Sequence, residues 1–230
     1  VSIFVNPTQF GSAEDLAMYP QDVERDISLL EVEHVDVVFA PGVEDVYPEG
    51  FGTFVQVEGV TEGLEGAARP GHFRGVATVV CKLFNIVQPD RAYFGQKDAQ
   101  QLRVIRKMVA DLNLPVEIRP VATVREADGL ALSSRNVRLS PEQRVASLAL
   151  SRALRAGEAL YQGGERDAER LRAAMRAVLA ELPEDMAQPD YVSVADADTL
   201  RELDRIDGPA LLSLAVRFGH VRLIDNIPLG

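Results

Sequence analysis

Strand-like and helix-like segments alternate from Val1 to about Ile118, and this alternation constrains the fold more than any other feature of the sequence. Short β-branched or aromatic runs that end at turn residues predict strands, and apolar residues at helical spacing predict helices. The predicted strands are 1–5, 34–40, 53–57, 91–95 and 116–118, and the predicted helices are 22–33, 73–87 and 98–112. Strands joined by helices usually pair in parallel through crossover connections, so we expect a Rossmann-like α/β sheet.

The pattern changes near Val124. Two helices are predicted over 141–161 and 166–182, followed by short strands near 191–194, 210–216 and 221–224. In the second helix one apolar stripe predicts a core face; its members are Leu171, Ala174, Met175, Val178, Leu179 and Leu182. We therefore expect a Rossmann-like domain over 1–123 and a smaller α+β domain over 124–230.

The charge of the chain limits the ligands that it can bind. The 230 residues include 24 Lys and Arg against 35 Asp and Glu, a formal net charge of −11. This sign does not suit a general binder of polyanions or membrane surfaces, so any phosphate site must be local. The single cysteine, Cys81, excludes an internal disulfide, and three scattered histidines (His34, His72 and His220) make a structural metal cluster improbable. A reducing compartment fits this composition best.

The first candidate for chemistry is the segment 92–101, in which a predicted strand ends in Gly95 and turns directly into a helix. Ligands bind at strand ends in sheets of this kind. Lys97 offers a point charge for phosphate, and Asp98 could accept ribose hydroxyls. The alternative is that Asp98 caps the helix and Lys97 is a solvated surface residue.

A second polar loop contains Ser133, Ser134 and Arg135 between Leu132 and Asn136. Two hydroxyls beside a guanidinium suit a phosphate chain. The alternative is an ordinary turn before a helix that starts with Ser140 as N-cap and Pro141, with Arg135 paired to a surface acid.

Two further segments carry polar groups near strand or helix ends. Asn6 and Gln9 follow the first strand, where neutral amides could orient a small hydroxy acid, or could serve only as turn residues. Arg69 and His72 precede the long helix 73–87 and could point to the same cleft, although a structural role is favoured for His72. His34, His220 and Cys81 have no neighbouring partner in sequence, and we expect them to be structural.

Taken together, these motifs closely resemble the pantothenate synthetase family. The resemblance runs from Val1 to Asn226 and rests on segments 4–11, 19–20, 65–66 with 69–73, 95–101 and 128–136. Two positions depart from the family pattern: Gln96 stands where Glu is frequent, and Ala99 where an aromatic residue is common. Neither change replaces Lys97, Asp98 or the glutamines, so we expect both to be tolerated.

The resemblance implies a nucleotidyltransferase-type fold and an ATP-dependent condensation of pantoate with β-alanine through a pantoyl adenylate, with Mg²⁺, in a cytoplasmic homodimer. It implies that Gln9 and Gln101 hold pantoate, with Asn6 beside them. It further assigns Gly95, Gln96, Lys97 and Asp98 to ATP and Val124 to adenine. Leu132, Ser133, Ser134 and Arg135 would form a mobile phosphate-binding loop. Lys97, Ser133, Ser134 and Arg135 would stabilise the charge of the adenylation transition state.

In the family, a first strand and a His-x-Gly-His loop precede the segment that begins here at Val1. We therefore expect the 230-residue chain alone to be weakly active or inactive. Two alternatives stay open: a related nucleotidyltransferase that acts on another acceptor, and a nucleotide-binding remnant or regulatory module.

Overall fold

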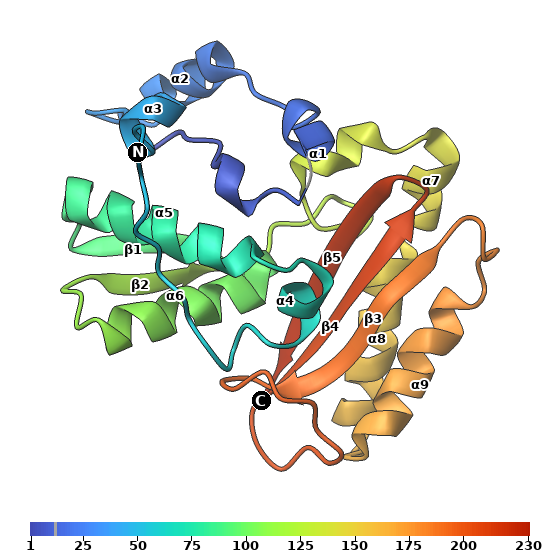
Figure 1. The fold of residues 1–230 in the computed structure, drawn as a ribbon. Helices are drawn as coiled ribbons and strands as arrows, with labels where there is room; N and C mark the ends of the chain where they lie inside the picture. The colour runs from blue at the N-terminus through green and yellow to red at the C-terminus, as the bar shows by residue number, and fades with distance from the viewer. Residues whose placement is uncertain (12) are drawn as a thin grey trace.

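A computed structural model describes residues 1–11 and 13–230 (Figure 1). Its helices and strands, in chain order, are η1 (Pro7–Gln9), α1 (Ala13–Ala17), α2 (Val23–Val32), α3 (Val43–Val46), α4 (Leu64–Ala68), α5 (His72–Val87), β1 (Arg91–Gly95), η2 (Gln96–Asp98), α6 (Ala99–Asp111), β2 (Glu117–Val121), η3 (Ser134–Arg138), α7 (Pro141–Ala146), α8 (Ala149–Gln162), α9 (Ala168–Leu179), β3 (Gln188–Asp196), β4 (Ala210–Phe218) and β5 (Val221–Leu229).

The unit β1–α6–β2 confirms the expected parallel crossover. Strands β1 and β2 pair in parallel, with Arg91 opposite Glu117 and Gly95 opposite Val121. Helices α5 and α6 lie beside this pair (Figure 1) and share one core, to which α5 contributes Val76. The strand β1 therefore ends in the turn that starts α6, which is the geometry that the ligand-site hypothesis requires.

The N-terminal strands differ from the prediction. Segments 1–5 and 34–40 do run in parallel, because Ile3 N donates to Phe39 O at 2.9 Å and Phe39 N donates to Val1 O at 2.8 Å, but only Ser2 and Phe39 form a bridge. Segment 53–57 forms no strand either. There the N–H of Val55 donates to the Thr78 hydroxyl rather than to a neighbouring strand.

The C-terminal part is built on an antiparallel sheet in the order β3–β4–β5. Helices α8 and α9 cover one face of this sheet (Figure 1), and alternate residues of β4, including Leu212, Leu214 and Val216, point into the core that they form. The intervening positions Leu211, Ser213 and Arg217 line a cavity on the opposite face. Because successive side chains of a strand point to opposite faces, one set of β4 side chains packs into the core and the other faces the cavity.

The helical predictions for this part hold with one change. Helix α9 buries Leu171, Met175 and Leu179 fully, as its stripe predicted. The single helix expected over 141–161 is two helices, α7 and α8, interrupted at Ser147, whose hydroxyl donates to Arg144 O at 2.7 Å. Ser140 caps α7 in a capping box with Gln143, and Pro141 occupies the first turn, as expected.

The buried residues form two large cores, one between Val46 and Met108 and the other between Ala146 and Leu229. A small third group, Ala99, Leu200 and Leu211, lies where the two meet. Among the residues that the structure describes, no helix is long and apolar enough to cross a membrane.

Candidate active site

A cavity of about 380 Å³ opens between the two cores. The first half of the chain contributes α4, the start of α5 and the turn between β1 and α6; the second half contributes η3 and strands β3, β4 and β5. Five of the residues predicted to form the site line this cavity: Lys97, Asp98, Gln101, Ser133 and Arg135. The fold therefore brings together two loops that the sequence analysis had considered separately.

The turn 95–98 is held in place by strand β5. The Asn226 side-chain amide donates to the backbone oxygens of Gln96 at 3.0 Å and of Lys97 at 2.8 Å. Asp98 occupies the N-cap position of α6, but its carboxylate makes no capping hydrogen bond, so the N-cap explanation of this residue fails. A Cβ on Gly95 would meet no atom within 4 Å, which leaves the strand end open to a ligand.

The second loop is also anchored to β5. Leu132 N donates to Val124 O at 2.9 Å, which places the expected adenine contact beside the expected phosphate loop. The neighbouring Arg125 binds Asp225 through two hydrogen bonds of 2.7 and 2.9 Å. Five of the residues predicted to bind ATP do not line the cavity themselves: Gly95, Gln96, Val124, Leu132 and Ser134. Leu132 and Ser134 flank Ser133 in the chain, and Gln96 precedes Lys97.

Ser133 and Arg135 form the tip of that loop. The Ser133 hydroxyl accepts a hydrogen bond from Arg135 N at 3.2 Å and so caps η3. The Arg135 guanidinium lies 5.8 Å from the centre of the Tyr19 ring, within range of a cation–π contact. Both side chains reach the cavity from a short, locally stabilised turn.

Asn6 and Gln9 do not line the cavity. The Asn6 side chain is buried, and its Nδ2 donates to Gln9 Oε1 at 3.0 Å and to Gly75 O at 3.1 Å. Its Oδ1 accepts from the Tyr47 hydroxyl at 2.8 Å and from Thr8. Asn6 thus uses its side-chain amide to fix the loop. The backbone oxygen of Gln9 bonds to two residues that do line the cavity, described next.

Arg69 and His72 make that connection, and both line the cavity, as one reading of the sequence expected. Arg69 Nη2 and His72 Nδ1 lie 3.2 and 2.9 Å from Gln9 O. Burial and the charge of Arg69 lower the pKa of His72 to about 4. The neutral ring therefore donates from Nδ1 to Gln9 O, and its Nε2 accepts from Arg69 Nη1 at 3.3 Å.

The charge of the cavity is opposite to the charge of the chain. The described lining residues include six Lys or Arg and four Asp or Glu, whereas the whole chain has a net charge of −11. Sequence reasoning missed the residues that β3, β4 and β5 contribute, among them Tyr191, Arg217, Arg222 and Asn226. Only the alternation along these strands could have indicated them. The cavity is thus a local region with more basic than acidic residues in an acidic chain, which is the setting that the composition requires of a phosphate site.

The chain matches known proteins along nearly its whole length. The family model described as pantoate-beta-alanine ligase matches residues 1–228. A pantothenate synthetase of Chloroflexus aurantiacus is 69% identical over 228 residues, which are 98% of this chain and 80% of that protein. The crystal structure of pantothenate synthetase from Thermus thermophilus has a TM-score of 0.94 at 52% identity, covering 98% of this chain and 81% of that one.

A third relative was solved with ligands. The pantoate-beta-alanine ligase of Francisella tularensis, described as complexed with beta-gamma ATP and beta-alanine, has a TM-score of 0.76 at 33% identity and covers 98% of this chain and 77% of that one. The α/β fold and these relatives define an ATP-dependent ligase that forms an amide bond. The chain belongs to the pantoate–β-alanine ligase family.

Proposed function

We propose that the cavity between the two cores is where pantoate is adenylated by ATP before β-alanine attacks. The observation that carries this proposal is that Lys97, Asp98, Gln101, Ser133 and Arg135, which come from two distant loops, line one basic cavity. A polyanionic nucleotide and a small acid need such a local concentration of cations and hydroxyls, because the rest of the chain is acidic.

ATP would lie along the turn between β1 and α6. Gly95 and Gln96 offer backbone at the open strand end, Lys97 a cation, and Asp98 a carboxylate that does not cap the helix. Val124 and Leu132, joined by a backbone hydrogen bond, would contact the base and the start of the phosphate chain. Ser133, Ser134 and Arg135 would then bind the phosphates with two hydroxyls and a guanidinium.

Pantoate would lie between two glutamines. Gln101 lines the cavity from the first turn of α6, one turn from Lys97. Gln9, which does not itself line the cavity, would bind from the side of Arg69 and His72, which hold its backbone oxygen, while Asn6 orients its side chain through Oε1. Neutral amides suit a hydroxy acid whose carboxylate must stay free to react.

The reaction would take two steps. In the first, the pantoate carboxylate attacks the α-phosphorus of ATP and pyrophosphate leaves. In the second, the amine of β-alanine attacks the acyl carbon of the adenylate, the C–O bond to AMP breaks and an amide forms. Lys97, Arg135, Ser133 and Ser134 would stabilise the charge that develops on the α-phosphate and the leaving pyrophosphate.

The residues present fit Mg²⁺ that arrives with ATP. Mg²⁺ in nucleotide sites is usually held by one or two carboxylates together with substrate phosphates. Asp98 is such a carboxylate in the cavity, and among residues 1–11 and 13–230 no group of three or more His, Cys, Asp or Glu is arranged to hold a metal. When bound, Mg²⁺ would neutralise charge on the phosphates.

We further propose that 1–123 and 124–230 are separate domains and that the protein is a cytoplasmic homodimer. The two separate cores support the division, with the second domain closing over ATP as a lid. The homodimer and the cytoplasmic location rest on the family. Light scattering on the purified protein tests the dimer, which a monomeric mass at working concentration would contradict.

The decisive test is pantoate-dependent release of pyrophosphate from Mg-ATP without β-alanine, measured on the 230-residue chain and on a version that carries the family's first strand and His-x-Gly-His loop before Val1. Lys97→Met should lower this rate about a hundredfold. The matched control is Lys107→Met on α6, the helix that follows the Lys97 turn, where the lysine pairs with Asp111 on the surface. Binding of ATP without any response to pantoate would contradict the proposal and favour another acceptor or a nucleotide-binding module.

A further inference from the structure

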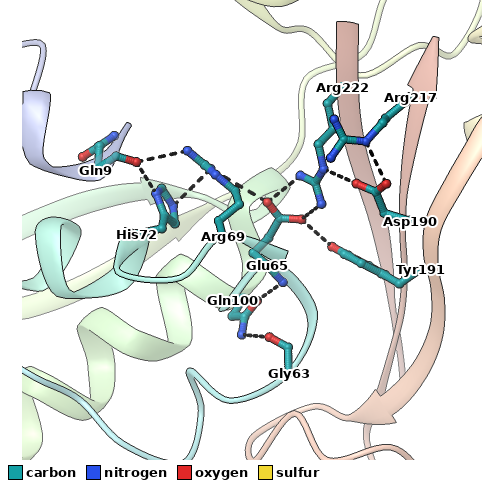
Figure 2. A network of polar contacts seen from close by, with 10 residues as sticks. All are labelled: Gln9, Gly63, Glu65, Arg69, His72, Gln100, Asp190, Tyr191, Arg217 and Arg222. Carbon is teal, nitrogen blue, oxygen red and sulfur yellow. Dashed lines mark hydrogen bonds and ion pairs between the residues drawn. The ribbon is translucent and has the colours of Figure 1, made fainter. Parts of the chain in front are cut away.

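The buried carboxylate of Glu65 joins the two halves of the chain at the cavity (Figure 2). Glu65 lies in the first turn of α4, is only 6% exposed, and accepts two hydrogen bonds of 2.7 Å from Nη1 and Nη2 of Arg222 on β5. The Tyr191 hydroxyl on β3 donates a third bond to Glu65 at 3.0 Å. One carboxylate from the first half thus holds two strands of the C-terminal sheet.

Arg222 is itself fixed on its other side. Its Nε donates to Asp190 at 2.5 Å, and Asp190 also accepts from Nε of Arg217 at 2.9 Å. All three nitrogens of the Arg222 guanidinium therefore bind carboxylates, in the bidentate geometry that arginine favours. Because the sheet holds Arg222 in this way, Arg222 in turn fixes the position of the Glu65 carboxylate.

On the opposite side, Glu65 leads to the loop that carries Gln9 (Figure 2). Its Oε2 lies 3.8 Å from Nη1 of Arg69, the C-cap residue of α4. Arg69 Nη2 donates to Gln9 O, and His72 contacts both Arg69 and Gln9 O. The network therefore runs without a break from Asp190 on β3 to the backbone of Gln9.

The backbone of Glu65 is fixed to helix α6 as well. Gln100 Oε1 accepts from Glu65 N at 2.9 Å, while Gln100 Nε2 donates to the backbone oxygens of Val60 and Gly63, each at 2.9 Å. Gln100 lies on α6 directly before Gln101, which belongs to the proposed site. Gln100 thus ties helix α6, which carries Gln101, to α4 and to the segment before it.

Stability alone is a poor reason for such an arrangement, because burying an ion pair costs desolvation that the attraction often fails to recover. Burial raises the pKa of Glu65, but its bonds to Arg222 and Tyr191 and the charge of Arg69 outweigh this and lower it. Glu65 therefore stays ionised through the neutral range. A fixed, charged, doubly anchored side chain is what precise placement of a reacting group requires.

We propose that Glu65 is a positioning residue that holds Gln9, through Arg69 and His72, at a fixed place relative to the C-terminal sheet and the Lys97 turn. This inference rests on the role of Gln9 in binding pantoate under the proposed function. Glu65 acts through Arg69 and is not required to touch substrate. Its loss displaces the pantoate side of the cavity more than the ATP side, which Asn226 and Arg125 hold independently.

The test compares Glu65→Gln with Glu202→Gln in the protein that releases pyrophosphate in the assay above. Glu202 binds buried Arg172 through Nε at 3.1 Å and Nη2 at 2.6 Å, and it does not line the cavity, so its variant disturbs a comparable arginine–carboxylate contact away from the site. Hydrogen exchange is followed at the amides of Gln9 and Phe10, which bond to Asn6 O and Pro7 O. The KM for pantoate and the Kd for Mg-ATP are measured alongside.

Glu65→Gln is expected to speed exchange at these two amides and to raise the KM for pantoate about tenfold, with the Kd for Mg-ATP within about twofold of the wild type. Glu202→Gln is expected to leave all three unchanged. Unchanged exchange in Glu65→Gln, or an equal rise in both constants, would overturn the inference. Faster exchange with an unchanged KM for pantoate would support the positioning and overturn only the proposed role of Gln9.

A milder variant keeps the inference open to refutation if Glu65→Gln does not fold. Arg222→Lys retains the charge but loses the bidentate contact, because an ammonium cannot bind both Glu65 oxygens and Asp190 in the same geometry. It is expected to raise the KM for pantoate about threefold and to speed exchange at Gln9. Wild-type values of both in Arg222→Lys would overturn the inference.

Discussion

The side chain of Asn226 supports the backbone of Lys97: its amide nitrogen donates to the Lys97 carbonyl oxygen at 2.8 Å. The same nitrogen donates to Gln96 O at 3.0 Å, so one β5 residue fixes both peptides of the turn from which Lys97 projects. Asn226 is only 5% exposed. The lysine expected to bind phosphate is therefore positioned by a residue of the other half of the chain, more than a hundred positions away.

Asn226→Asp tests this support. The substitution keeps the shape of the side chain but places a carboxylate oxygen against two carbonyl oxygens, so it removes two donors and adds repulsion. We expect the KM for ATP to rise about tenfold and the melting temperature to fall, with the KM for pantoate less affected. Asn85→Asp, an exposed position on α5 that bonds only within its helix, is the matched control. Equal effects of the two substitutions on the ATP constant would refute the role of Asn226.

Gly75 allows the loop of Asn6 and Gln9 to lie directly on helix α5. A Cβ at this position would lie 2.5 Å from Thr8 O and 2.9 Å from Gln9 N, closer than Cβ atoms approach other heavy atoms in folded proteins. We expect Gly75→Ala to displace the loop, to destabilise the protein by about 1–3 kcal/mol and to raise the KM for pantoate. Chemical denaturation and pyrophosphate release measure the two effects.

Gly208→Ala is the control for that prediction, since a Cβ there would meet no atom within 4 Å. It should change neither the stability nor the KM for pantoate. If Gly75→Ala behaved like Gly208→Ala, the loop would have to be able to move away from α5 without loss.

His72 predicts a pH dependence of stability. Its pKa falls from 6.5 to about 4 on folding, because burial and Arg69 disfavour the charged ring. Between these values the unfolded chain binds more protons than the folded protein, so the contribution is fully present above pH 6.5 and is lost as the pH falls toward 4. Over this window the loss from His72 amounts to about 3 kcal/mol.

His72→Asn isolates the contribution of His72 to the pH dependence of the free energy of unfolding, because the Asn amide can donate to Gln9 O but does not titrate. The free energy of unfolding, measured from pH 7 to pH 4, should fall less steeply in the variant than in the wild type. Parallel curves would show that the ring titrates alike in the folded and unfolded states. The carboxylates that also protonate in this range are common to both proteins and cancel in the difference.

The sequence predicts best the elements whose pattern is local. The apolar period of α5, the period of α9 and the cap at Ser140 depend on residues within a few turns, and the structure confirms each of them. The strand over 1–5 was predicted from a β-branched and aromatic run that ends at a turn, and the strand over 53–57 from alternation along the chain; neither pattern identifies the neighbouring strand. A strand forms only where a neighbour completes its hydrogen bonds, and Val55 instead bonds to the Thr78 side chain.

In the candidate site, too, the sequence predicts the local features but not the long-range contacts. The turns at Lys97 and Ser133 could be found from the sequence, because a strand end followed by a helix and a polar loop are local patterns. The contacts that place them could not. Glu65 and Arg222 lie 157 positions apart, and their pairing depends on how α4 meets β5, which no periodicity encodes. The uncapped carboxylate of Asp98 likewise became evident only from the geometry of α6.

The contact between Arg125 and Asp225 gives a last prediction, for the segment between the two proposed domains. Asp225 is buried and binds the Arg125 guanidinium at 2.7 and 2.9 Å, and Arg125 also donates to Gly129 O at 3.1 Å. Asp225→Asn removes the charge and leaves Arg125 uncompensated, which should cost about 3–5 kcal/mol. Because Arg125 lies beside Val124 and supports the loop that leads to Ser133, we expect the Kd for Mg-ATP to rise as well.

The double variant Asp225→Asn with Arg125→Met separates the two effects of Asp225→Asn. Removing the stranded guanidinium should recover much of the stability, because an apolar side chain replaces an unpaired charge. It should not recover ATP binding, since the contact of Arg125 with Asp225 on β5 is still missing. Recovery of both stability and ATP affinity would show that the ion pair serves stability alone, and that the loop reaches its binding conformation without β5.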